Sequence, residues 1–181
     1  MNSPEFSGPY EKQTPPIIET SWRNVTVRAL DQSNLPELKN LIDKNVDYFA
    51  RGHIVAGLYD VVANEISDKD TPTANQRFGI WHRNTLIGYI GLTTDHDTAD
   101  GEYDVAYAID KDNAGLGITT AAVRALVNYE KELGHTFTAE VESDNIASQR
   151  VLKKLGFAAT NHYNDRDRPV YVQTGPTLVK R

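Results

Sequence analysis

Residues 104–133 read DVAYAIDKDNAGLGITTAAVRALVNYEKEL and predict a strand, a glycine turn and a helix, in that order. Val105, Tyr107 and Ile109 alternate with polar or small residues, which is the period of two typical of a strand. The helix that follows has an apolar stripe at helical spacing, made of Ile118, Ala121, Ala122, Ala125, Leu126, Tyr129 and Leu133. Gly134 comes just after this stripe, where a helix most easily ends with a positive φ angle.

The turn between the strand and the helix contains Gly115 and Gly117, one on each side of Leu116. The first N–H groups of a helix lack internal partners and lie at the positive end of its dipole, so such a turn can hold a phosphate. A P-loop needs a lysine after Gly117, and a dinucleotide fingerprint needs a third glycine at Thr120; the sequence has neither. The alternatives that remain are another phosphate ligand or a tight connection without a ligand.

Residues 137–157, FTAEVESDNIASQRVLKKLGF, predict a second strand followed at once by a helix. Asp144 or Asn145 is expected to cap the start of this helix, and Gly156 is expected to end it. Its apolar side would consist of Val151, Leu152 and Leu155.

Together, the segments VAYAIDKDNAGLGITTAA and DNIASQRVLKKLGF resemble motifs A and B of the GNAT superfamily of acyl-coenzyme A dependent N-acyltransferases. Within this superfamily, the chain is most similar to the ribosomal-protein (Rim-type) and antibiotic acetyltransferases, in which an Asn-x-x-Ser run leads to Leu-Gly-Phe. The resemblance spans residues 25–172. It implies a mixed α/β fold with a central, mostly antiparallel sheet of six or seven strands, splayed in the middle, with helices on both faces.

The resemblance also implies that acetyl-coenzyme A is the co-substrate. The glycine turn would present backbone N–H groups to its diphosphate, and motif B would contact its pantetheine arm. The residues implied in this binding are Tyr107, Ala108, Ile109, Ala114, Gly115, Leu116, Gly117, Ile118, Thr119, Thr120, Asn145 and Ser148. The chain departs from the family at Asp112, where Gln or Arg is usual. An acid beside a diphosphate is unfavourable unless it points away, and Lys111 is the candidate for the missing cation.

The implied reaction is direct attack of a primary amine on the acetyl thioester, without a covalent enzyme intermediate. Many relatives carry a tyrosine four residues after the Ser148 position as acid for the leaving thiolate, but this chain has Leu152, so Ser148 is the candidate acid. The amine must lose a proton, and Asp104 and Glu102, two apart on the same strand face, are the candidate bases, followed by Glu142. The structural alternatives are a backbone hydrogen bond for Ser148 and a solvated surface position for each acid.

Residues 43–70 are predicted to be mostly helical, with interruptions at Gly52 and Gly57. In the resembled superfamily, the first two helices and the link between them wall the acceptor site. The candidate acceptor contacts are therefore Tyr48, Phe49, His53 and Tyr59. Packing in the core is the alternative for each aromatic residue. The expected acceptor is a protein N-terminus or a small molecule such as an antibiotic, a toxin, an amino acid or a polyamine.

The predicted organisation is a flexible arm over residues 1–20, a single acetyltransferase domain over 21–175 and a tail over 176–181. Ser3–Phe6 is typical of residues left by a cloning vector. The remaining predicted elements are a strand over 22–30, a helix starting near 34–37, a hairpin over 76–92, and strands over 157–163 and 169–173.

The composition and charge of the chain disfavour several classes of function. The chain has 181 residues, a formal net charge of −6 and a pI of about 5.3, which disfavours nucleic-acid binding. It has no cysteine and no apolar run long enough to cross a membrane, and neither its five histidines nor its acidic loop 93–101 has metal-site spacing. We therefore expect a cytoplasmic enzyme without a metal, either a monomer or a homodimer. The alternative is a catalytically silent GNAT-fold module that binds a coenzyme A ester or a peptide.

Overall fold

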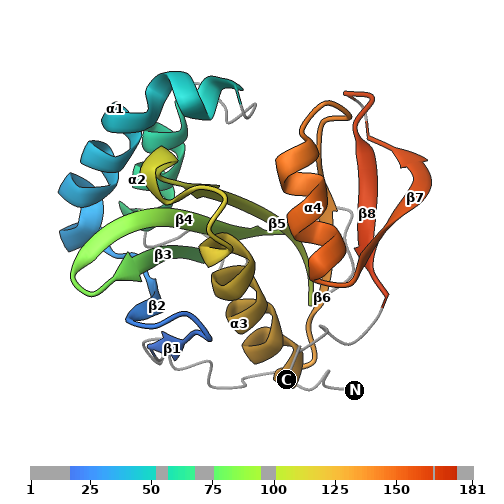
Figure 1. The fold of residues 1–181 in the computed structure, drawn as a ribbon, viewed down its shortest axis with the longest axis horizontal. Coiled ribbons are helices and arrows are strands. Elements are labelled where there is room, and N and C mark those ends of the chain that lie inside the picture. Colours follow the sequence, from blue (N-terminus) through green and yellow to red (C-terminus); the bar gives the residue numbers. More distant parts are fainter. Residues whose placement is uncertain (1–16, 52–56, 68–75, 95–100, 165, 175–181) are drawn as a thin grey trace, which may run out of the picture.

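The computed structural model describes residues 17–51, 57–67, 76–94, 101–164 and 166–174, which form one open sheet with helices on both faces (Figure 1). The strands are β1 (Ile18–Glu19), β2 (Val25–Ala29), β3 (Gln76–His82), β4 (Thr85–Thr93), β5 (Glu102–Ile109), β6 (Thr136–Glu140), β7 (Phe157–Tyr163) and β8 (Pro169–Gln173). The helices are α1 (Leu35–Arg51), α2 (Leu58–Ser67), α3 (Ile118–Glu132) and α4 (Ile146–Lys154), with short 3-10 helices at Gln32–Asn34 and Lys111–Asn113.

The sheet has eight strands in the order β1-β2-β3-β4-β5-β6-β8-β7. All neighbouring pairs are antiparallel except β5 and β6, which are parallel. The β5–β6 pairing joins only Glu102–Asp104 to Thr136–Thr138, after which the two strands separate. The mixed, mostly antiparallel and splayed sheet is therefore confirmed, with one strand more than the six or seven expected.

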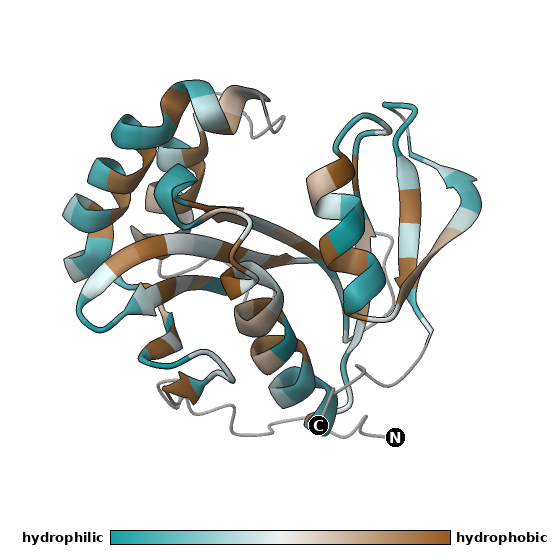
Figure 2. Cartoon of the chain, viewed as in Figure 1, coloured by the Kyte–Doolittle hydropathy of each residue, from teal (hydrophilic) through white to brown (hydrophobic). Residues whose placement is uncertain are grey.

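Two clusters of buried side chains hold the layers together, one on each face of the sheet. The larger cluster joins the sheet to α3 and α4 and includes Phe78, Leu126 and Leu152, whereas the second joins it to α1 and α2 through Leu38 and Val62. Figure 2 shows apolar residues along the central strands and on the helix sides that face them. Each fully buried side chain of this size contributes about 1.5–3 kcal/mol to stability.

Helix α3 starts and ends at glycines, as the sequence indicates. Gly117 precedes it with φ 86°, and Gly134 follows it with φ 92°, a conformation that costs glycine little. Leu133 was expected to face the core, but this prediction is wrong: its side chain is 58% exposed. The helix ends at Glu132, so the stripe that runs through Tyr129 is not continued by one more turn.

The hairpin predicted over 76–92 is formed by β3 and β4, and it contains a bulge next to Gly88. Ile80 pairs with Gly88 and Trp81 with Leu86, so Ile87 is the extra residue on β4. The backbone oxygen of Ile87 accepts a hydrogen bond from the Asp110 N–H at 2.7 Å. A Cβ on Gly88 would lie 2.7 Å from the Ala108 oxygen, so glycine lets the end of β5 pack closely against β4.

Several expectations fall at the edges of the described residues. Ile18 and Glu19 belong to the segment predicted as a flexible arm, but they form β1 and pair with Val27 and Thr26, because a two-residue strand is too short to produce a periodic pattern. The rest of that arm, the predicted tail from 176, His53 and most of the acidic loop lie outside the described residues.

None of the described helices is long and apolar enough to cross a membrane. Within the described ranges, no group of three or more potential metal-binding side chains occurs.

Candidate active site

A cavity of about 640 Å³ lies between the glycine turn, the end of β5 and α4. Ten of the twelve residues predicted to bind acetyl-coenzyme A line it: Tyr107, Ala108, Ile109, Ala114, Gly115, Gly117, Thr119, Thr120, Asn145 and Ser148. The other two lie elsewhere, because the Leu116 side chain is 53% exposed and Ile118 is buried in the larger core cluster. The structure thus brings the two sequence motifs together around one space.

The glycine turn gives this cavity backbone donors. Gly115 and Gly117 both have positive φ angles, 75° and 86°, which favour glycine over residues with a side chain. The first bond of α3 runs from the Ala121 N–H to the Gly117 oxygen. The amides of Ile118 and Thr119 precede this bond, so they belong to the group that has no partner within the helix. This is the arrangement in which a helix start binds a phosphate.

A smaller cavity of about 210 Å³ adjoins the first one. The two cavities share Tyr107, Ala108, Asn145 and Ser148, and they meet where β5 and β6 have separated. The smaller cavity is also lined by Asp104, Glu140, Glu142 and Arg168. It therefore contains three carboxylates and one guanidinium, a combination suited to a cationic or amine ligand.

Asp104 is the only one of the two preferred candidate bases that lines the smaller cavity, since Glu102 lines neither cavity. Its Oδ1 atom is shielded from solvent and has no hydrogen-bond partner among the described residues. Burial, followed by the nearby charge of Glu140, raises the pKa of Asp104 from 3.8 to about 7, although a backbone hydrogen bond at Glu140 opposes the shift. Asp104 therefore exchanges its proton near neutral pH.

The third candidate base, Glu142, is held in an ion pair. Its Oε1 atom accepts a hydrogen bond from Arg168 Nε at 2.5 Å. Arg168 comes from the connection between β7 and β8, where Asn164 also donates to Glu140. This connection thus provides hydrogen-bond donors to two of the three acids that line the smaller cavity.

The start of α4 places Ser148 at the junction of the cavities. Asn145 caps the helix, as expected, by accepting the Ser148 N–H at 3.1 Å. The Tyr107 hydroxyl donates to the backbone oxygen of Ser148 at 3.1 Å, and burial raises the pKa of Tyr107, so this phenol keeps its proton. The Ser148 hydroxyl forms no hydrogen bond with the residues that the structure describes, which leaves it available to a ligand.

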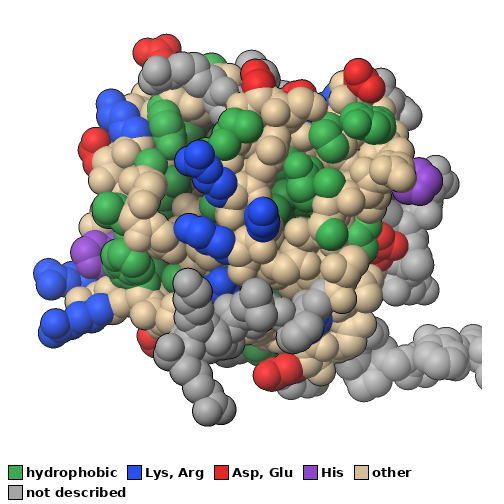
Figure 3. Space-filling model, turned by 45° about the vertical axis from the view of Figure 1, so that its right-hand side comes forward, with side chains coloured by type: hydrophobic (Ala, Val, Ile, Leu, Met, Phe, Trp, Pro, Cys, Tyr) green, Lys and Arg blue, Asp and Glu red, His purple; other side chains and the backbone are tan. Residues whose placement is uncertain are grey.

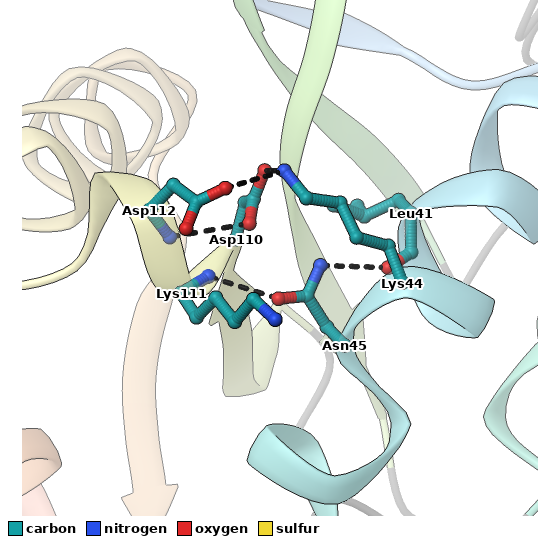
Figure 4. A network of polar contacts seen from close by, with 6 residues as sticks. All are labelled: Leu41, Lys44, Asn45, Asp110, Lys111 and Asp112. Atoms are coloured by element: carbon teal, nitrogen blue, oxygen red, sulfur yellow. Dashed lines mark hydrogen bonds and ion pairs between the residues drawn. The ribbon is translucent and has the colours of Figure 1, made fainter.

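The unusual acid Asp112 points to α1 rather than standing unpaired at the turn (Figure 4). Lys44 of α1 lies 2.8 Å from Asp112 and 2.6 Å from the buried Asp110. The hydrogen bond from Lys44 lowers the pKa of Asp112, and the bonds to Asp110 and Asp112 raise the pKa of Lys44. Asn45, the next residue of α1, accepts a hydrogen bond from the Lys111 N–H through its Oδ1 atom at 2.9 Å. The charge of Asp112 is thus balanced by a residue far away in the sequence.

The cations along the larger cavity differ from the one that the sequence suggested. Lys111 does not line it, whereas Arg150 and Lys154 of α4 do. Sequence reasoning missed both, although they are four residues apart and so lie on the same side of α4. It also missed Arg168, because nothing local indicates that the β7–β8 connection reaches the site.

The four candidate acceptor residues have different positions. Tyr48 and Phe49, at the end of α1, line the larger cavity. Tyr59 packs against the second core cluster and lines neither cavity, whereas its neighbour Leu58 lines the smaller one. His53 lies outside the described residues. Leu58 carries no signal in the sequence beyond its position at the start of α2.

The acetyltransferase (GNAT) domain family matches residues 24–158 of the chain. The chain is 30% identical over 147 residues to the probable N-acetyltransferase YjcK of Bacillus subtilis (strain 168), a match that covers 75% of this chain and 81% of that protein. The fold is similar to that of RimL, the ribosomal L7/L12 alpha-N-protein acetyltransferase in complex with coenzyme A, with a TM-score of 0.72 and 18% identity over 90% of this chain and 100% of that one.

A second similar structure is the microcin C7 self-immunity acetyltransferase MccE in complex with acetyl-coenzyme A and AMP, with a TM-score of 0.67, 16% identity, and 83% and 92% of the two chains covered. The predicted resemblance to the GNAT superfamily is thereby confirmed, and the fold is similar to that of a ribosomal-protein acetyltransferase. The chain belongs to the acetyltransferase (GNAT) domain family and is an acetyltransferase.

Proposed function

We propose that the enzyme transfers an acetyl group from acetyl-coenzyme A to a primary amine by direct attack in a ternary complex. The observation that carries this proposal is the pair of adjoining cavities with opposite charge. The larger holds Arg150, Lys154 and the glycine-turn amides, and the smaller holds three carboxylates. An anionic thioester carrier would enter the first, an amine would enter the second, and the two would meet beside Ser148.

Asp104 is the proposed base. The attacking nitrogen needs a free electron pair, so its ammonium form must first give up a proton. The Asp104 carboxylate takes that proton, the nitrogen attacks the thioester carbon, and the carbon–sulfur bond breaks. Because the pKa of Asp104 is about 7, this carboxyl group is better matched to an α-amine, whose pKa is roughly 7.7–8.0, than to a lysine-type amine near 10.4. This match favours a protein N-terminus or an amino-acid-like molecule as the acceptor.

Two further groups would assist the reaction. Because β6 pairs with β5 only as far as Asp104, the backbone of Val105–Ala108 has no strand partner on that side and offers amides to the thioester oxygen. The Ser148 hydroxyl lies at the junction of the cavities, where it would give a proton to the leaving thiolate and regain one from the solvent. Tyr107 fixes the position of Ser148 through its bond to the backbone oxygen.

The test is release of coenzyme A thiol from acetyl-coenzyme A in the presence of an amine panel: short peptides with free N-termini, the same peptides with blocked N-termini, amino acids, aminoglycosides and polyamines. We expect turnover with free α-amines and initial-rate patterns of a ternary complex. Turnover of polyamines alone would contradict the α-amine assignment, and ping-pong kinetics would contradict direct attack. Stabilisation by acetyl-coenzyme A without turnover of any amine would favour a binding module instead.

A further inference from the structure

The glycine turn needs support from outside itself to keep one geometry. Gly115 and Gly117 both have positive φ angles, but glycine adopts positive and negative φ angles almost equally readily. The turn lies between α3, which packs in the larger core cluster, and the short helix Lys111–Asn113. The amides that would bind a diphosphate therefore stay in place only if the Lys111–Asn113 side is also held by another part of the fold.

Helix α1 supplies this support through Asn45 (Figure 4). The Asn45 Oδ1 atom accepts a hydrogen bond from the Lys111 N–H at 2.9 Å, and its Nδ2 atom donates to the Leu41 oxygen at 2.9 Å. Asn45 is 1% exposed, so water does not compete for these two bonds. The bond to Leu41 thus orients the amide group, and the amide group fixes the first residue of the short helix.

Asn45 lines neither cavity, so it would act on a ligand only through the turn. Phe49 follows it by four residues on α1, is buried and lines the larger cavity. Residues four apart lie on the same side of a helix. One side of α1 therefore both holds the glycine turn and forms part of the cavity wall, which sets the position of the turn relative to that wall.

The ion pairs of the neighbouring Lys44 are a weaker candidate for this task. Its side chain is 48% exposed, and ion pairs of exposed side chains contribute little because water screens them. Figure 3 shows Lys and Arg side chains near the centre of the face that it presents and Asp and Glu towards its edge. A change of charge would alter the attraction of that face for an anion. Asn45 is uncharged, so its replacement tests the position of the turn alone.

We propose that Asn45 is a positioning residue for the carrier: its bond to the Lys111 N–H holds the glycine turn in the geometry that binds the diphosphate. This inference rests on the proposed function, in which the larger cavity takes acetyl-coenzyme A. Without the bond, the turn occupies the binding geometry for only a fraction of the time, and the Kd rises by the inverse of that fraction. Loss of one buried hydrogen bond shifts such an equilibrium by about tenfold.

The test is Asn45→Leu, which fills a similar volume but cannot accept the Lys111 N–H. Titration calorimetry with the full chain should give a Kd for acetyl-coenzyme A about tenfold higher than in the protein without substitutions. At saturating acetyl-coenzyme A, kcat and the KM for the fastest amine of the panel should stay within about twofold. The matched control is Asn40→Leu, which makes the same change at an exposed position of α1 outside both cavities and should keep the Kd.

Each other outcome counts against the proposal. If Asn45→Leu lowers the free energy of unfolding in urea but leaves the Kd unchanged, Asn45 has a structural role only and the proposal is overturned. An equal rise of the Kd in Asn40→Leu assigns the effect to α1 as a whole and also overturns it. If the protein without substitutions does not bind acetyl-coenzyme A, the proposed function fails and this inference fails with it.

A second variant keeps the test decisive if circular dichroism shows that Asn45→Leu does not fold. Asn45→Ser keeps a polar side chain, but its hydroxyl oxygen lies one bond closer to the backbone than the Asn45 Oδ1 atom and so falls short of the Lys111 N–H. The same tenfold rise of the Kd is expected, and an unchanged Kd would overturn the proposal.

Discussion

Asp104→Asn should inactivate the enzyme and stabilise its fold at the same time. The substitution keeps the shape of a side chain at the edge of the smaller cavity but removes its ability to take a proton. General-base catalysis by one side chain contributes about 10²–10⁴-fold to the rate, so kcat/KM should fall by about that factor. The Kd for acetyl-coenzyme A should stay within about twofold, because Asp104 does not line the larger cavity.

The effect on stability follows from the same pKa. Asp104 has a pKa of about 7 in the folded protein and 3.8 as its ordinary value, so between these pH values the folded state holds the proton more tightly than the unfolded state. The folded enzyme therefore loses stability as pH rises from about 4 to about 7. The full shift corresponds to roughly 4 kcal/mol, and because the residue is only half-buried we expect about 1–2 kcal/mol. Asp104→Asn should recover this free energy above pH 7 and change nothing below pH 4.

Urea unfolding at pH 4, 6 and 8 measures the stability change, and steady-state kinetics between pH 5.5 and 9 measures the activity. In the enzyme without substitutions, kcat/KM should rise with pH through about 7, where the base becomes ionised. The Asp104→Asn variant should lack this rise. Glu102→Gln is the control, because it removes a carboxylate from the same strand outside both cavities. An Asp104→Asn variant whose kcat/KM still rises with pH near 7, or whose free energy of unfolding at pH 8 is lower than that of the enzyme without substitutions, would refute this account of the base.

Three further results are expected. Gly117→Glu should weaken acetyl-coenzyme A binding, measured by calorimetry, at least about 100-fold. Gly117→Ala must adopt the same positive φ angle but adds no charge, so it should weaken binding less. Equal losses in the two variants would show that backbone strain alone is responsible. Ser148→Ala should lower kcat by roughly 10²-fold with Kd for acetyl-coenzyme A nearly unchanged, and normal turnover would remove Ser148 from the mechanism. Lys44→Gln should weaken acetyl-coenzyme A binding by about two- to fivefold by leaving Asp112 uncompensated, and adding Asp112→Asn should restore it.

The parts of the fold that the sequence predicts well are those in which local pattern and tertiary contacts agree. The alternation in β5, the glycines around α3 and the Asn145 cap of α4 each depend on residues within a few positions of one another. The same reasoning failed at Leu133, because the place where α3 ends depends on the turn that follows it rather than on the stripe.

Only the site residues that belong to one of the two sequence motifs could be predicted from the sequence. Lys44 reaches Asp110 across 66 residues of sequence, and no local pattern pairs them. Arg168 reaches Glu142 because β8 inserts between β6 and β7, an order that periodicity does not give. The raised pKa of Asp104 has the same origin, since it comes from burial and from Glu140 on the neighbouring strand. Sequence reasoning could name Asp104 and Glu102 as candidate bases, but it could not show that only Asp104 of these two lines the smaller cavity.

The separation of charge between the two cavities would let an acidic protein bind the highly anionic carrier of the proposed function. Carboxylates near the glycine turn would repel the diphosphate, and the one acid in that turn, Asp112, is paired with Lys44. Arg150 and Lys154, which form no ion pair with another described residue, line the larger cavity, and the three acids line the smaller one. In the proposed function, the field across the splay would draw the carrier and a protonated amine to opposite sides of it. In the proposed function, only the neutral thioester would have to reach the acidic side, and the cation that lines the smaller cavity, Arg168, is paired with Glu142.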